Sequence, residues 1–463
     1  MLRAKSFCGA GLAVVALTAL IALSVAPNPA DAQRRTLSAN ELLVTGFQSI
    51  EQSDPVTALK IAEALLTRDA THSPALQLKS AALRALGRPK DAIPVARSAW
   101  RYAKSDHEKY GAALITAQAL SSAGYRTRAQ FWLRRANQAA PNEQARRIAA
   151  RDFNYVRNRN PWATELTFNV APSNNINNGS ANATSQLFGL PIEFDLSGDA
   201  RALSGYEISG GISTRYRLSQ TNLQRHDLVF ALHHKTFQLS AEAKRQAPSA
   251  KGSDFAYSTL TVGYQFAGRR PNTGLQNSFA LSATHHRYGG KSYYNALRAS
   301  TGVRYAVSST SRVFANAALE GHFSTSGREN SKIWSTSLGV DHVLANRDRV
   351  TLSINGTRAL SPDVNQDYRR AGINLDYSLN RQIAGMQFSF GLSASKRDSD
   401  ASTLVPGGRH DRTVSANITA TLTNIEYYGF VPSITLSASK TDANLALFER
   451  NNFGIQFGIV SKL

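Results

Sequence analysis

Apolar residues recur at two different spacings along the chain, and the change falls at residues 158–161. From about Leu37 to Arg157 the sequence is rich in Ala, Leu, Arg and Gln, and its apolar residues are spaced as on one face of a helix. Beyond Pro161, apolar residues alternate with Thr, Ser, Asn and Gly, which is typical of strands with one polar face. The pattern predicts an α+β protein with helices and strands in separate domains.

The second region divides into about fourteen alternating segments, an even number as in single-chain bacterial barrels. In residues 413–422, for example, Val414 and Ile418 share one face while Thr413 and Asn417 share the other. This succession predicts an antiparallel transmembrane β-barrel. The predicted strands begin near Trp162, Tyr206, Arg225, Asp254, Leu275, Tyr293, Arg312, Ile333, Arg349, Tyr368, Gly385, Arg412, Phe430 and Asn452.

The connections between the predicted strands alternate in length. Those around 221–222 and 308–310 are brief, whereas 172–205, 240–253 and 398–411 are long. A soluble β-sandwich would also alternate, but short periplasmic turns with longer external loops favour an outer-membrane barrel. Lipid offers no partner for backbone N–H and C=O groups, so the sheet must close. We therefore expect a barrel in contact with outer-membrane lipid, with the N-terminal domain in the periplasm.

The last segment has the pattern of a barrel-closing strand, which the outer-membrane barrel insertion machinery would recognise. Its alternating apolar residues, followed by the C-terminal one, are Phe453, Ile455, Phe457, Ile459 and Leu463. Aromatic residues near predicted strand ends are candidates for interfacial girdles. They are Trp162, Tyr264, Phe266, Tyr294, Tyr305, Trp334 and Tyr377.

The helical region contains a weak internal repeat. Small residues recur in two segments, and Gly87 and Gly124 stand at the same distance ahead of each. A period of about 34 to 37 residues with small residues at the helix crossing resembles tetratricopeptide repeats, which stack into a groove for a peptide or protein partner. A generic helical spacer is the alternative. The expected packing residues include Ala92, Ala99, Ala129, Ala136 and Pro141.

The first residues read as a secretory signal. Arg3 and Lys5 precede an apolar stretch from Gly9 to Val25, and a small-x-small cleavage site ends with Ala30 and Ala32. A membrane anchor helix is the alternative, but the apolar run is short for a span of about 20 residues. Residues 1–32 are therefore expected to be a signal peptide, which contains Cys8, the only cysteine.

The formal charge of +21 does not predict nucleic-acid binding, because the basic residues are scattered and an exported chain does not meet nucleic acid. The pairs His233-His234 and His285-His286 point to opposite faces of their strands, and no nucleophile motif lies nearby. We expect no catalysis, cofactor or metal.

Three asparagines in the first long connection are candidates for contact with an external ligand, although turn formation is the more common role of such residues. They are Asn174, Asn175 and Asn177.

Three local features, in order, resemble the surface lipoprotein assembly modifier (Slam) family. Helical repeats run into a strand that begins at Asn160-Pro161-Trp162 and ends in the loop 173–177. The segment Gly429-Phe430-Val431-Pro432 opens the penultimate strand, and Asp442-Ala443-Asn444 is followed by Glu449-Arg450-Asn451-Asn452. The resemblance implies an outer-membrane translocon whose periplasmic repeats receive a client protein and whose barrel delivers it to the surface.

The sequence thus predicts a signal peptide at 1–32, a periplasmic repeat domain at 33–158 and an outer-membrane barrel at 159–463. Two functions remain open. The first is the translocon, with surface lipoproteins or secreted proteins as clients that enter through the repeat groove. The second is an outer-membrane pore or exopolysaccharide export channel whose repeats act as a scaffold. The sequence contains no phosphate-binding glycine loop that would indicate a nucleotide as the energy source.

Overall fold

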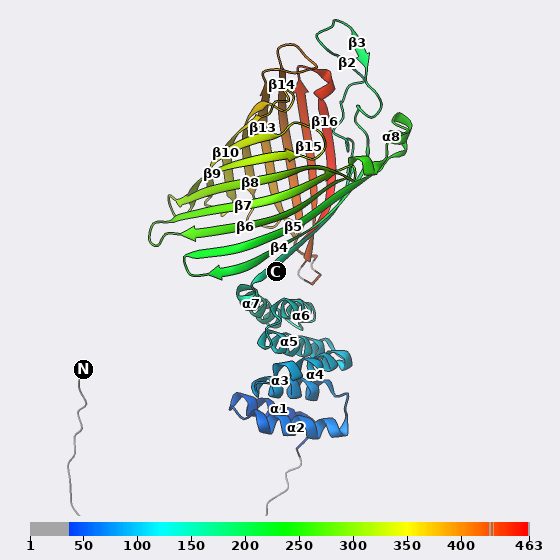
Figure 1. Cartoon of the computed structure of the whole chain (residues 1–463). Helices are drawn as coiled ribbons and strands as arrows, with labels where there is room; N and C mark the ends of the chain where they lie inside the picture. Colours follow the sequence, from blue (N-terminus) through cyan, green and yellow to red (C-terminus); the bar gives the residue numbers. More distant parts are fainter. Residues whose placement is uncertain (1–36, 426, 429, 462–463) are drawn as a thin grey trace, which may run out of the picture.

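The computed structural model describes residues 37–425, 427–428 and 430–461. The predicted signal peptide at 1–32, with Ala30 and Ala32, lies outside the described residues, as does Leu463. Within them, seven helices form an N-terminal stack and fourteen strands form a closed antiparallel barrel (Figure 1). The prediction of tetratricopeptide-like repeats followed by a barrel of about fourteen strands is confirmed.

The helices pair into antiparallel hairpins. The first helix of each hairpin also packs on the next, with α1 against α3 and α3 against α5. This is the arrangement of tetratricopeptide repeats, in which neighbouring repeats bury a continuous core. The helices are α1 (Ala39–Glu51), α2 (Pro55–Arg68), α3 (Ser73–Ala85), α4 (Pro89–Tyr102), α5 (Asp106–Ser122), α6 (Arg126–Gln138) and α7 (Glu143–Arg159).

Polar side chains begin several of these helices. Ser38 and Glu41 form a reciprocal capping box at α1, and Asp54, Ser105 and Asn142 accept hydrogen bonds from the first turns of α2, α5 and α7. Each cap satisfies backbone N–H groups that have no partner within the helix. The sequence therefore sets the helix starts locally.

Small residues allow the helices to approach closely. Ala92, Ala99, Ala129 and Ala136 are fully buried in the helical stack. Ser80 on α3 donates a hydrogen bond of 3.0 Å to the carbonyl oxygen of Ala92 on α4. Larger side chains there would force the hairpins apart. Pro141, in contrast, is exposed in the turn between α6 and α7.

The barrel strands follow the chain in order, each antiparallel to the next, and β1 closes the ring against β16. Their starts agree with the sequence prediction to within a few residues. The strands are β1 (Trp162–Ser173), β4 (Gly205–Gln220), β5 (Gln224–Leu239), β6 (Tyr257–Arg269), β7 (Leu275–Tyr288), β8 (Lys291–Ala306), β9 (Ser311–Ser324), β10 (Ser331–Val343), β11 (Arg349–Leu360), β12 (Tyr368–Ser378), β13 (Met386–Ser399), β14 (Arg409–Leu422), β15 (Phe430–Ala443) and β16 (Arg450–Ser461).

The two faces of the barrel wall differ in polarity. Large apolar side chains such as Leu166, Leu338 and Leu392 are more than half exposed, and they alternate with polar residues along each strand. Such an apolar outer face is stable only in lipid, because water would leave it unburied. We call the end of the barrel next to α7 the near rim and the opposite end the far rim (Figure 1).

One predicted girdle residue faces the other way. Tyr294 lies on the inner face of β8, where its ring stacks between His286 and His322 at centroid distances of 4.1 and 4.4 Å. Tyr294 is three residues from Leu297, so the two side chains point to opposite faces of β8, and Leu297 is 55% exposed on the outer face. Tyr294 is therefore part of a luminal aromatic cluster, because register decides the face of a strand residue and aromatic character does not.

The connections at the far rim contain structure of their own. A small hairpin, β2 (Thr184–Gln186) and β3 (Glu193–Asp195), projects from the first connection. The connection from β5 to β6 contains α8 (Ala241–Gln246) and the 3-10 helix η1 (Gly252–Phe255). Residues of these connections and of the end of β5 form a small apolar cluster. It consists of Ile176, Leu203, Phe237, Leu239, Ala243 and Ala247.

Candidate functional site

The helical domain passes directly into the barrel wall. The backbone N–H of Arg217 on β4 donates to the carbonyl oxygen of Pro161 at 2.8 Å, and its guanidinium donates to the carbonyl oxygen of Asn158 at 2.7 Å. Asn160 donates a hydrogen bond of 3.0 Å to the Thr127 hydroxyl of α6. These bonds hold the end of α7 against β1 and β4.

A second contact joins α6 to the turn between β14 and β15. The Arg134 guanidinium donates a hydrogen bond of 2.8 Å to the carbonyl oxygen of Tyr428 and lies 4.6 Å from the centre of the Phe430 ring. The backbone N–H of Tyr428 donates to Gln138 Oε1 at 3.3 Å. The helical stack is thus fixed to the near rim at two places.

A groove of about 680 Å³ lies on the face of the helical stack formed by α3, α5, α6 and α7. Its lining includes Ala117 and Gln118 of α5, Leu133 of α6, and Tyr155 and Val156 of α7. The size falls within the range of about 300 to 1,000 Å³ that is typical of ligand sites. Arg159 of the groove is the last residue of α7, three positions before β1 begins.

The groove is basic. Arg84, Arg126, Arg151 and Arg159 line it together with one acid, Asp152, whose Oδ1 lies 3.2 Å from the Arg151 guanidinium. Burial lowers the pKa of Arg84, because taking the guanidinium away from water disfavours its charged form. An acidic or carboxylate-bearing ligand would offset this cost.

Arginines also gather on the inner barrel wall at the near rim. The buried Asp227 carboxylate has its Oδ2 2.8 Å from Arg225 Nε and 3.6 Å from Arg215 Nε, and Arg217 is its register partner across β4 and β5. Three cations around one carboxylate leave this place positively charged. The inner wall at the near rim, which we call the barrel entrance, and the helical groove are therefore both positively charged.

A similar arrangement lies on the inner wall at the far rim. Arg409 and Asp411 form a bidentate pair with donor–acceptor distances of 2.9 and 2.6 Å. Arg397 is the register partner of Asp411 on the neighbouring strand. Arg397 donates to the carbonyl oxygen of Asn365 at 3.1 Å. The polar lumen is thus basic at both ends.

The seam between β1 and β16 is the most sparsely paired part of the ring. Every residue of β1 has a register partner in β4. Only three residues of β1 have a register partner in the described part of β16, and these pairs are Asn169–Gly458, Val170–Phe457 and Ser173–Gly454. Pro172, which has no N–H to donate, lies between Val170 and Ser173 at the far-rim end of β1. Among the described residues, the near-rim part of β1, residues 162–168, is not in register with β16.

An asparagine side chain closes the far end of this seam. Asn174 donates a hydrogen bond of 2.9 Å to the carbonyl oxygen of Asn451 and accepts one of 2.8 Å from the N–H of Phe453. The amide thereby does what a peptide group of a longer β1 would do. Among the described residues, the seam is fastened at the far rim and sparsely paired at the near rim.

The other two predicted loop asparagines also bond within the protein. Asn175 is buried and donates to Gly179 and to Asn452 Oδ1. Asn177 donates to the carbonyl oxygens of Asp199 and Arg201 at 2.8 Å. The proposed external ligand contact would have to replace these bonds.

The two histidine pairs contact polar side chains on neighbouring strands. His234 Nδ1 is 2.8 Å from the Ser258 hydroxyl, and His285 Nδ1 is 2.8 Å from Asn295 Oδ1. In the part of the chain that the structure describes, no group of three or more His, Cys, Asp or Glu residues is arranged to hold a metal ion. None of the helices in these residues has the length and apolar character needed to span a membrane.

The architecture defines a class of protein: an outer-membrane-type β-barrel with a helical repeat domain at one rim. Residues 162–458 match the family described as surface lipoprotein assembly modifier. The match spans the barrel from β1 to β16, and the chain belongs to this family. No curated protein matches the chain.

Solved structures resemble each half separately. The type III secretion translocator chaperone SycD of Yersinia enterocolitica is 17% identical, with 28% of this chain and 91% of that one covered at a TM-score of 0.23. OccAB3 of Acinetobacter baumannii is 9% identical, with 64% and 98% covered at a TM-score of 0.35. OmpT of Vibrio cholerae is 7% identical, with 65% and 99% covered at a TM-score of 0.33.

Sequence reasoning missed the basic groove and the seam. The arginines of the groove are scattered between residues 84 and 159, so only the stacking of hairpins brings them together. The sparse near-rim part of the seam has no signal in the sequence of the first strand. Its recognition required the pairing of the first strand with the last.

Proposed function

We propose that the protein is an outer-membrane translocon that moves client proteins, surface lipoproteins or secreted proteins, from the periplasm to the cell surface. The near rim then faces the periplasm and the far rim faces outward. The family assignment and the barrel fold support a transport role rather than an enzymatic one. The observation that carries the proposal is the basic groove, held by Arg134 and Arg217 beside the barrel entrance.

The groove supports capture of an extended acidic segment. Its arginines supply forked N–H donors for carboxylates, while Leu133, Tyr155 and Val156 offer apolar surface for neighbouring side chains. Arg217, the register partner of Asp227 on the inner wall, bonds to the carbonyl oxygen of Asn158, which precedes the groove residue Arg159. A continuous positive field along groove and entrance would guide such a segment toward the lumen.

The seam supports a route for the client strand. The near-rim part of β1 presents backbone groups that no described residue of β16 pairs in register. An extended client segment could add to this edge as a strand. The backbone groups of the client would then be hydrogen-bonded at membrane depth. Folding of the client outside would then supply the direction. The closing strand β16 also offers the barrel insertion machinery its recognition segment.

Protease shaving of whole cells that co-express a candidate surface lipoprotein tests the proposal. In the variant R126E/R151E the charge of the groove is reversed at two positions, and we expect client exposure to fall at least about tenfold, a loss of about 1.4 kcal/mol. The matched control R68E/R101E makes the same charge change at exposed positions outside the groove. Unchanged exposure in R126E/R151E would remove the groove from the mechanism.

A deletion of residues 33–158 tests the whole helical domain. We expect the barrel to insert, with the heat-dependent gel shift of a folded barrel, but the client to stay inaccessible to protease. Single-channel recording then separates translocon from pore. A large, steady current from the full chain would favour the passive export channel.

A further inference from the structure

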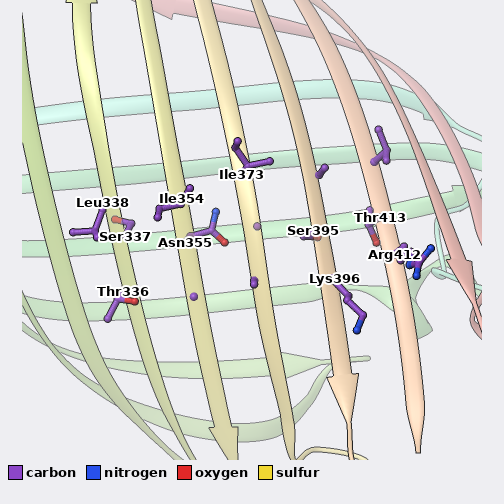
Figure 2. Close-up of a pocket in the computed structure, with 15 residues that line it drawn as sticks. Thr336, Ser337, Leu338, Ile354, Asn355, Ile373, Ser395, Lys396, Arg412 and Thr413 are labelled. Atoms are coloured by element: carbon purple, nitrogen blue, oxygen red, sulfur yellow. The ribbon is translucent and has the colours of Figure 1, made fainter.

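The lipid-facing wall of the barrel has a hollow of about 730 Å³ that spans β10 to β14. One register row across these strands consists of Thr336, Gly356, Ala371, Lys396 and Arg412. The short side chains of the first three leave the wall recessed. Figure 2 shows Lys396 and Arg412 together at one side of the hollow.

The next row toward the near rim is apolar throughout. It consists of Leu338, Ile354, Ile373, Ala394 and Val414, which are in register from strand to strand. Because this row is apolar, the floor of the hollow suits hydrocarbon. The row on the other side, toward the far rim, begins with Trp334 and Arg358, residue types typical of a membrane–water boundary. The hollow therefore lies just inside that boundary.

The two cations at the hollow are available to a ligand. Lys396 Nζ lies 2.9 Å from Asp398 Oδ2, yet the lysine side chain is still 55% exposed. Arg412 has Asp442 as a register partner, but that carboxylate pairs with Lys440 at 2.9 Å. Among the residues that the structure describes, no carboxylate lies within ion-pair distance of Arg412. An anionic group placed between Lys396 and Arg412 would complete the charge balance.

We infer that this hollow binds one phosphorylated acyl lipid of the outer leaflet. The phosphate lies between Lys396 and Arg412, and an acyl chain covers Gly356 and Ala371 above the apolar row. Charge complementarity selects the occupant: a protein surface or a neutral lipid would leave Arg412 at the membrane boundary without a counter-ion. The inference rests on the outward orientation of the far rim, but not on client delivery.

Native mass spectrometry of the full chain in detergent, with lipid A as the probe, tests the inference. We expect one retained lipid A on the wild type and at least about tenfold weaker retention by K396Q/R412Q, because charge-assisted hydrogen bonds to phosphate are lost. The control K291Q/K332Q removes the same charge from strand positions outside the hollow and leaves the pair between Lys440 and Asp442 intact. It should retain lipid A as the wild type does.

A second variant tests the hollow itself. Ala371→Phe fills the recess and keeps both cations, so we expect retention to fall without a change in charge. The heat-dependent gel shift shows that each variant is folded. Equal loss in K291Q/K332Q, unchanged retention in K396Q/R412Q, or equal retention of dephosphorylated lipid A, phosphatidylglycerol or inorganic phosphate would each overturn the inference. None of these outcomes depends on a client, so client delivery stands or falls separately.

Discussion

The Arg134 guanidinium on α6 donates a hydrogen bond of 2.8 Å to the backbone carbonyl oxygen of Tyr428, in the turn between β14 and β15. The two residues are 294 positions apart in the chain. Their contact adds a second attachment to the covalent link between α7 and β1. Two attachments give the basic groove a defined position at the near rim. A single flexible link would allow the helical stack to swing.

The first prediction concerns this attachment. In Arg134→Ala, we expect the distance distribution between spin labels at Ala64 and Ala345 to broaden, because one of two anchors is lost. The barrel itself should keep its heat-dependent gel shift. Arg128→Ala, which removes a contact with the Tyr125 ring within the helical stack, serves as the control. A narrow, unchanged distribution in Arg134→Ala would show that the link at residue 160 alone sets the position.

The second prediction concerns helix packing. Ala129 is fully buried where α6 crosses its neighbours, so Ala129→Leu must displace packed atoms and should cost about 1 to 3 kcal/mol. Thermal melting followed by helical circular dichroism of the full chain checks this. Ala64→Leu on the exposed side of α2 adds the same atoms without overpacking. Equal melting of the two variants would contradict the packing role of Ala129.

The third prediction concerns pH. Asp348, in the near-rim turn between β10 and β11, accepts hydrogen bonds from the N–H of Asn380 at 2.7 Å and from the Tyr377 hydroxyl at 2.5 Å. The bonds from Asn380 and then Tyr377 hold the pKa of its carboxyl below the ordinary value. Because the folded pKa is lowered, this stabilisation is complete above the unfolded value of about 4 and is lost as pH falls through the folded one.

Urea unfolding at pH 7 and at pH 3 checks this dependence. Asp348→Asn should be less stable than the wild type at pH 7, and the difference should shrink at pH 3. Asp195→Asn, at an exposed position of the β2–β3 hairpin, is the control. A difference that grows toward acid pH would have the wrong sign for a lowered pKa.

The fourth prediction concerns the far end of the seam. Asn174→Ala removes both the bond to the Asn451 carbonyl and the bond from the Phe453 N–H, so hydrogen exchange at residues 450–454 should become faster. Asn177→Ala removes bonds within the first far-rim connection only, so it should leave that exchange unchanged. Protection that persists in Asn174→Ala would show that backbone pairing alone closes the seam.

The fifth prediction concerns opening of the seam. A disulfide between N169C and G458C joins β1 to β16 at a register pair, and we expect it to abolish client exposure reversibly, with recovery on reduction. The control joins N169C to S209C, which locks the fully paired boundary between β1 and β4. Both barrels should fold alike. Full client exposure with the first disulfide formed would exclude passage through the seam.

Local sequence determined the elements of this protein. Period-two alternation fixes which side of a strand faces lipid, as in the residues from Thr413 to Leu422, because successive side chains point to opposite faces. Helical spacing and small residues such as Ala92 and Ala129 fix the hairpins in the same way. These features depend on neighbours within a few residues or on a simple repeat, so they were predictable from one chain.

Tertiary structure alone decided the sites. Which strands meet at the seam, and how far they pair, depends on closure of the ring, so the role of Asn174 could not be derived locally. The basic groove and the lipid-facing hollow likewise join residues from several helices or strands. Tyr294 was assigned to the wrong face because its aromatic character suggested a girdle, whereas the register of β8 turns it toward the lumen. Periodicity specifies what each element buries, but only the packed chain specifies which elements become neighbours.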